Sequence, residues 1–272
     1  TRSILAKVAP QISAPNLTFG NLECPLSSEG PHDPMECCFR ADPDTVDVLK
    51  HGGFDIVSVA NNHSLNAGRT GMRNTLATLT KHGIAYTGSN PVKEQSWTPA
   101  YFTVNGLKVG FLACTDLSFE HGSDCKISRD PAAAYANVAK AKRGCDLLFV
   151  SIHWGEEYQQ HRDERQRRVA LALIDAGADC ILGHHPHTLQ GIGVYKGRPI
   201  LYSMGNFVFD QMFAEYTREG FILRCKLQGG YLTEIDILPY KIFDYCQPVV
   251  LEQGSGDYLI KKLLQISDIP GS

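Results

Sequence analysis

The 272-residue sequence has no long apolar segment, no strongly basic segment and no low-complexity or repeated region. Nothing approaches the roughly 18 consecutive apolar residues of a membrane-spanning helix, and no segment has the form of a secretory signal peptide. The net charge is −3 with a pI near 6.3, whereas a nucleic-acid-binding protein usually presents a basic face. We therefore expect no transmembrane segment in this chain and no nucleic-acid partner.

The cysteines also lack an ordered pattern. There are nine, an odd number, and none is spaced as C-x-x-C. Cys114, Cys180 and Cys225 lie in apolar runs that are typical of strands, as expected of small buried hydrophobic residues. This usage favours a reducing, cytoplasmic compartment. The chain begins at Thr1 without Met and runs straight into an apolar helical spacing, so an upstream strand, anchor or signal could have been removed.

Hydrophobic residues make up 43% of the sequence and charged residues 20%, the composition of a globular protein with a full core. Apolar strand-like runs alternate with helical patterns at about 2–13, 43–52, 69–82, 132–143, 162–176 and 256–266. Turn pairs indicate hairpins at 105–106, 196–197 and 229–230. The pattern predicts an α/β fold and a single domain over 1–272, with two packed sheets and outer helices.

Ligand-type side chains follow directly on predicted strands in several places. The segments are 21–23, 61–63, 153–155, 183–187 and 205–206. Ligands of open α/β sheets bind beyond the carboxyl ends of the strands, so we expect these segments to line one shared pocket. Their Asn, Glu and His side chains suit a divalent metal.

The segment 183–187 carries the most specific local signal. His185 precedes Pro186, and a residue before proline is driven to an extended conformation. Side chains at i and i+2 of an extended segment point to the same side, so His185 and His187 are predicted to converge as metal ligands while His184 faces away. The alternative is a pair of packing or surface histidines.

The other predicted metal ligands are Glu23, Asn62 and His153. Taken singly, each has an ordinary alternative: a surface carboxylate, a turn residue and a core histidine, respectively. His63 follows Asn62 and is predicted to be a general acid or base, since histidine titrates near neutral pH. A further group is predicted to bind substrate or support the ligands: Asn61, Glu157, His184, Asn206 and Arg40.

Longer motifs surround these residues. They are NLECPL at 21–26, ANNHSL at 60–65, HWGEEY at 153–158, GHHPH at 183–187 and YSMGNFVFD at 202–210. Together they resemble the capsule-synthesis protein CapA family, associated with poly-γ-glutamate, over about residues 1–240. That family is similar to the calcineurin-like metallophosphoesterases.

The resemblance implies a four-layer α/β/β/α sandwich with a two-metal site at the strand ends. It implies that Glu23 bridges the metals, that Asn62 and the histidines 153, 185 and 187 bind them, and that His63 is the catalytic acid. The family normally opens with a strand ending in Gly-Asp, which this chain lacks, so one ligand is missing and one or two ions are expected (Mn, Zn, Fe or Ca). Asn66 stands where the family often has Asp.

Three functions remain open. The first is a metal-dependent hydrolase of a phosphoester or γ-glutamyl bond with His63 as general acid. The second is a non-catalytic accessory protein that binds an anionic capsule polymer during synthesis or export. The third is a metal-dependent epimerase acting at a peptide α-carbon. The resemblance implies the cell envelope, in contrast to the cytoplasmic compartment that the cysteines favour.

Overall fold

The computed structural model describes residues 4–30, 39–90, 97–118 and 122–269. Its contacts divide the chain into two compact units. Unit 1 comprises Thr1–Ala100 and Phe111–Ala134, and unit 2 comprises Tyr101–Gly110 and Tyr135–Ser272. Among the described residues, no helix is both long and apolar enough to cross a membrane.

Unit 1 contains a parallel sheet of short buried strands. Its order is β1 (Phe19–Asn21), β2 (Ile56–Ser58) and β3 (Ala85–Thr87). The strands β1 and β2 correspond to predicted strands, whereas β3 was not predicted because three residues give too short a pattern. Since β1 and β2 are parallel, the chain leaves both at the same edge of the sheet.

The helices of unit 1 follow local sequence signals. Asp42 caps the first turn, accepting a hydrogen bond from the backbone N–H of Asp44 at 2.9 Å, and a 3-10 turn (Pro43–Thr45) then leads into α2 (Val46–His51). The helix expected over 2–13 is α-helical only in α1 (Ala9–Ile12). Its apolar spacing is nevertheless used, since Val8 and Ile12 are buried.

Helix α3 (Gly68–Lys81) supplies the core of unit 1. Met72, Leu76 and Leu79 recur at helical spacing and pack in one cluster with Val57 and Val59. This packing fixes β2, and therefore the polar residues that follow it.

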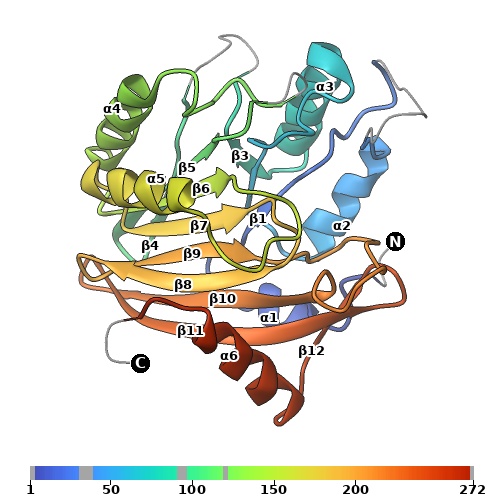
Figure 1. The fold of residues 1–272 in the computed structure, drawn as a ribbon. Coiled ribbons are helices and arrows are strands. Elements are labelled where there is room, and N and C mark those ends of the chain that lie inside the picture. The colour runs from blue at the N-terminus through green and yellow to red at the C-terminus, as the bar shows by residue number, and fades with distance from the viewer. Residues whose placement is uncertain (1–3, 31–38, 91–96, 119–121, 270–272) are drawn as a thin grey trace. The chain divides into compact units, whose positions relative to one another are not determined.

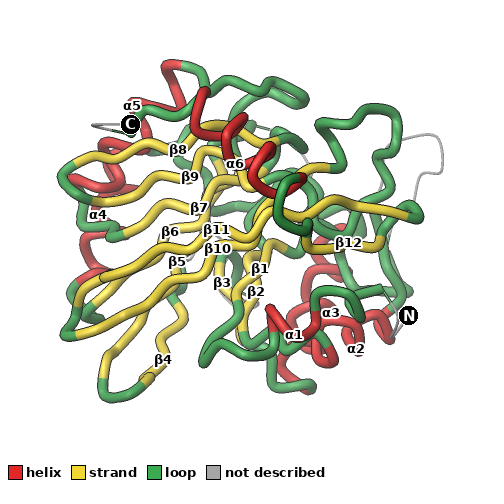
Figure 2. The backbone as a smooth tube through the Cα atoms, turned by 90° about the horizontal axis from the view of Figure 1, so that it is seen from below, coloured by secondary structure: helices red, strands yellow, loops and turns green. Residues whose placement is uncertain are grey.

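A six-stranded sheet has the order β4-β5-β6-β7-β9-β8, seen strand by strand in Figure 2. Most of it belongs to unit 2, whereas the second half of β5, from Phe111 on, belongs to unit 1. The strands are β4 (Ala100–Val104), β5 (Leu107–Thr115), β6 (Leu147–His153), β7 (Cys180–His184), β8 (Leu189–Tyr195) and β9 (Arg198–Met204). The strands β6, β7 and β9 run parallel. The predicted hairpin at 105–106 is present, with positive φ at both residues.

Helices α4 (Pro131–Lys142) and α5 (Glu164–Asp175) lie on one side of this sheet and β10 and β11 on the other (Figure 1). Asp163 and Gln166 form a capping box that starts α5. An antiparallel sheet joins β10 (Glu219–Gln228), β11 (Tyr231–Phe243) and β12 (Gln247–Val250). Helix α6 (Ser255–Gln265) packs on β8 and β11. Strand β12 was not predicted.

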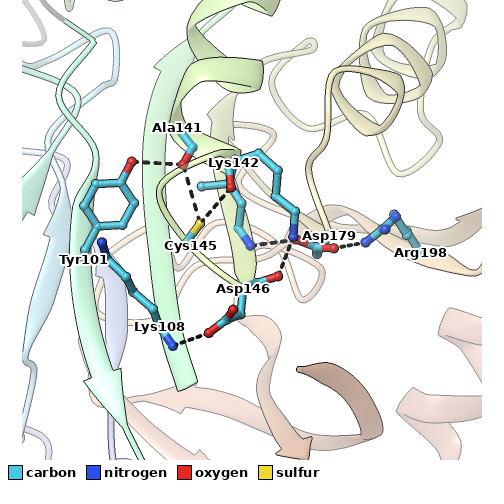
Figure 3. Close-up of polar contacts among 9 residues, drawn as sticks. Tyr101, Lys108, Ala141, Lys142, Cys145, Asp146, Asp179 and Arg198 are labelled. Carbon is cyan, nitrogen blue, oxygen red and sulfur yellow. Dashed lines mark hydrogen bonds and ion pairs between the residues drawn. The ribbon is translucent and has the colours of Figure 1, made fainter. Parts of the chain in front are cut away.

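A buried carboxylate ties together the strand ends that lie opposite to the histidine segments. Asp179 accepts hydrogen bonds from the backbone N–H of Leu148 and from Lys142 Nζ, both at 2.7 Å, and it pairs with Arg198 (Figure 3). Its side chain is only 6% exposed. Removing it leaves a buried N–H unsatisfied and two cations without their acid.

Asp179→Ala is therefore expected to lower the free energy of unfolding by about 2–3 kcal/mol. Asp175→Ala is the matched control, because Asp175 pairs with Lys196 at an exposed site, and it should cost less than about 0.5 kcal/mol. Urea unfolding of both variants measures the difference. Equal midpoints would show that the Asp179 network does not stabilise the fold.

Candidate metal centre

In unit 1, Asn61 joins the segments 21–23 and 61–63. Its Nδ2 donates to the carbonyl oxygen of Leu22 at 2.8 Å and to Asn21 Oδ1 at 3.4 Å. Its Oδ1 accepts from the backbone N–H of His63 and from Ser64 Oγ, each at 3.1 Å. Asn61 is fully buried. The geometry of this side chain supports the neighbouring residues, one of the two roles predicted for it.

Asn62 differs from its neighbour in this respect. Its Oδ1 is buried, yet it has no hydrogen-bond partner among the residues that the structure describes. A buried polar atom without a partner costs about 1–3 kcal/mol, and nearly all such atoms in native proteins are satisfied by protein, water or an ion. An amide oxygen in this state fits a metal ligand.

His63 is held in a defined orientation. Its Nδ1 lies 2.8 Å from Asn66 Oδ1, which also accepts from the backbone N–H of Phe39 at 2.9 Å. The oxygen can only accept, so Nδ1 of His63 carries the proton. The ring of Phe39 stacks on the imidazole with centroids 3.9 Å apart.

Glu23 follows β1 within the same unit. Asn21 Nδ2 donates to Glu23 Oε2 at 3.0 Å, which orients the carboxylate. Burial, together with the charge of Glu23, raises the pKa of the Cys24 thiol to about 12. Arg40 donates to the carbonyl oxygen of Gly30 at 3.3 Å. Its predicted role in anion binding gains no support from this contact and stays a prediction.

In unit 2, the parallel strands β6 and β7 bring two histidine segments side by side, with His153 opposite His184 in the register. Trp154 anchors the chain after β6, since its Nε1 donates to the carbonyl oxygen of Tyr202 at 2.8 Å. The rings of His153 and His185 lie 4.9 Å apart, and both residues are buried. These two predicted ligands are therefore neighbours.

His185 and His187 do converge, but the backbone differs from the predicted one. Their φ angles are +103° and +56°, so this stretch is a left-handed bend rather than an extended strand. Non-glycine residues pay a strain for positive φ, and such residues cluster at functional sites. The ring centroids are 6.0 Å apart.

Asn206 orients His187. Asn206 Oδ1 lies 2.8 Å from His187 Nδ1, while its Nδ2 donates to the carbonyl oxygen of Thr217 at 2.9 Å and to Gln211 Oε1 at 3.1 Å. The amide assignment is thus fixed by its other partners, and Nδ1 of His187 must be the protonated nitrogen. Burial lowers the pKa of His187, which favours the neutral ring that a metal requires.

His184 and Glu157 have different surroundings. Nε2 of His184 is a buried atom even though the residue keeps some exposed surface, and burial lowers the pKa of His184 to about 4. This histidine is therefore neutral at neutral pH. Glu157 is exposed, and a carboxylate oxygen of it lies within 4.8 Å of ligand nitrogens of both His185 and His187.

The donor chemistry of each unit suits a divalent ion. Unit 1 offers the buried amide oxygen of Asn62, and the preceding residue, Asn61, is bonded to the carboxylate-bearing segment 21–23. Unit 2 offers a group of two imidazoles and one carboxylate. Nitrogen and oxygen donors of this kind match Zn²⁺, Mn²⁺ or Fe²⁺.

Comparison with known proteins agrees with this chemistry. Residues 1–211 match the family described as "Bacterial capsule synthesis protein PGA_cap". The chain belongs to this family. Similar curated proteins include "PGA biosynthesis protein CapA" of Bacillus subtilis, 33% identical over 89% of this chain and 66% of that protein. "Capsule biosynthesis protein CapA" of Bacillus anthracis is 32% identical over 89% of this chain and 62% of that protein. The chain thus spans somewhat less than two thirds of these relatives.

A more distant relative is named "Probable polyglutamine synthesis accessory protein" from Mycobacterium tuberculosis, 28% identical over 85% of this chain and 67% of that protein. Among solved structures, a hypothetical protein from Thermus thermophilus matches with a TM-score of 0.60 at 14% identity, over 88% of this chain and 93% of that chain. A phosphatase from Mycoplasma pneumoniae matches with a TM-score of 0.50 at 13% identity, over 75% of this chain and 66% of that chain.

These findings confirm the resemblance and the α/β fold of the metallophosphoesterase type that the sequence predicts. Sequence reasoning noted that Asn66 stands where the family often has Asp but did not foresee its contact with His63. The available signal was its spacing of three residues after the histidine, where the family often has an acid. The stacking of Phe39 on His63 had no signal in the sequence.

The tautomer of His187 provides a test of this geometry. We expect Nδ1 to be protonated in the wild type, as measured from the nitrogen chemical shifts of the histidine ring. Asn206→Ala removes the acceptor and should weaken this preference by about 1 kcal/mol, roughly a fivefold change in the tautomer ratio. Gln211→Ala is the control, because it leaves Asn206 Oδ1 in place. A protonated Nε2 in the wild type would contradict the assignment.

Proposed function

We propose that this chain is a metal-dependent hydrolase that acts on a phosphoester or γ-glutamyl-type bond. The observation that carries the proposal is the buried Oδ1 of Asn62, which has no hydrogen-bond partner in the described part of the chain. The next residue is His63, whose ring is oriented by Asn66. A metal ligand and a proton donor would thus occupy adjacent positions. The family membership and the metallophosphoesterase-type fold support this reading.

The residues that would hold the ions are Glu23, Asn62, His153, His185 and His187. Bound divalent ions would supply Lewis-acid activation of a water molecule and of the scissile bond. Asn206 holds His187 in the tautomer with Nε2 unprotonated, which is the form in which this nitrogen can bind a metal. Burial lowers the pKa of His187 and so favours the neutral imidazole, which is the form that binds metal.

His63 would donate a proton to the leaving group from Nε2. Asn66 Oδ1 accepts a hydrogen bond from Nδ1–H of His63 and so fixes the orientation of the ring. The ring of Phe39 covers one face of the imidazole. These features suit a group that releases its proton as the bond breaks.

One relative's name describes an accessory protein, which favours a second candidate: binding of an anionic polymer at the same metal centre without turnover. An accessory function predicts that the chain binds the anionic polymer in a metal-dependent way and forms no product from it. In an epimerase, solvent deuterium would enter the substrate without cleavage.

Metal content per chain tests the centre itself. We expect purified wild type to carry one or two divalent ions by elemental analysis, and His185→Ala combined with His187→Ala to lose at least one, because two imidazole donors are removed. His51→Ala is the matched control, as its side chain lies on the exposed surface of α2. A folded wild-type protein that takes up no divalent metal would contradict the proposal.

The role of His63 can be tested separately from metal binding. His63→Ala should lower kcat by about 10²–10⁴ for alkyl phosphates, whose leaving groups need a proton, and by less for 4-nitrophenyl phosphate. Metal content should stay unchanged. His82→Ala serves as the control, because His82 is a half-buried histidine at the end of α3. Equal losses with both leaving groups would exclude His63 as the general acid.

A further inference from the structure

The loop that follows β6 presents two adjacent glutamates, Glu156 and Glu157, both exposed. Only the second belongs to a group of potential metal donors among the described residues. A carboxylate oxygen of Glu157 and one ring nitrogen each of His185 and His187 lie within 4.8 Å of one another. Sequence reasoning had assigned Glu157 to substrate binding or ligand support, but the three atoms lie close enough together to form a candidate site for one ion.

Hydrogen bonds hold this loop in place. The backbone N–H of Tyr158 donates to the carbonyl oxygen of Pro186 at 2.7 Å, which ties the loop directly to the histidine segment. Gln190 Nε2 donates to the carbonyl oxygens of Gln159 and His161, at 2.9 Å and 3.3 Å. Gln190 is itself fixed by Gln166 at 2.8 Å, and both glutamines are buried.

Two backbone features add to this arrangement. Gly155 has a φ of +80°, and a Cβ atom there would lie 2.8 Å from the Gln166 side chain, so the turn requires glycine. Tyr158 has a φ of +64° and stacks its ring over His187 with centroids 6.0 Å apart. Glu157 lies between Gly155 and Tyr158, so its backbone is constrained on both sides.

We propose that Glu157 is a direct metal ligand that completes a His-His-Glu site with His185 and His187. The inference rests on the proposed metal centre and adds a donor to it. Two imidazoles and a carboxylate form a known ligand set for Zn²⁺ hydrolytic sites, which keep further positions open for water or substrate. Glu157 itself is exposed to solvent.

The test uses Mn²⁺ or Zn²⁺ alone, titrated calorimetrically into the metal-stripped full chain. Glu157→Gln should raise the Kd for the metal at least about 10-fold, since even residues that only orient a metal ligand change metal affinity 10- to 100-fold. Glu156→Gln removes the same charge from the adjacent position and should bind like the wild type. The loss at Glu157 should persist in high salt, where a purely long-range charge effect is screened.

Spectra of the Co²⁺-loaded protein give a second readout that is independent of activity. Loss of a carboxylate ligand in Glu157→Gln should change the visible absorption bands, while Glu156→Gln should leave them as in the wild type. Circular dichroism of the metal-free variants checks that both fold, which the exposure of both glutamates leads us to expect.

The outcomes separate this inference from the proposed function. Equal affinities and spectra for the two glutamine variants, with metal lost in His187→Ala, would overturn the role of Glu157 and leave the metal centre standing. A selective loss in Glu157→Gln from a protein that hydrolyses nothing would support the ligand and contradict the hydrolase. A wild type that binds neither ion would overturn both.

Discussion

The proposed metal centre depends on the buried side-chain oxygen of Asn62, which has no hydrogen-bond partner among the described residues. The contrast with its neighbour is instructive, because the amide of Asn61 is engaged at both ends. Asn206 in unit 2 is engaged in the same way. The fold therefore satisfies buried amides where it uses them as supports, whereas the oxygen of Asn62 has no such partner within the described residues. A cation would supply the missing interaction and offset the cost of burial.

The elements predicted best are those with long periodic patterns. Helices α3 and α5 and strands β6 and β7 lie within a few residues of their predicted positions, because one face or the whole of each is buried. The polar segments at the strand ends could be predicted as well, since parallel strands of one sheet leave their carboxyl ends at the same edge.

Other features depend on tertiary contacts that no local pattern encodes. The first helix comprises only four residues, Ala9–Ile12, although the apolar spacing in the sequence predicted a longer one. The bend at His185 and His187 differs from the extended conformation expected for a residue before proline. The hydrogen bonds from Gln190 to the loop that carries Glu157 join residues 31 and 29 positions apart, so they depend on the folded chain.

Membership in the capsule-synthesis family describes a context for the protein, and the fold adds a scaffold, but neither fixes a reaction. The chemistry must be inferred from individual side chains. Here the inference depends on the buried histidines, on the amides of Asn66 and Asn206 that orient two of them, and on the carboxylate of Glu157.

The path of the chain between the units has a consequence for how the protein is made. The carbonyl oxygen of Asn61 accepts a hydrogen bond from the backbone N–H of Ser123, and Thr87 Oγ1 accepts one from Ala113. Unit 1 is therefore completed by residues that are synthesised after the chain has already entered unit 2. During translation the loop that carries His63 cannot complete these contacts until the later segment has been synthesised. No single cut in the gene would yield unit 1 intact.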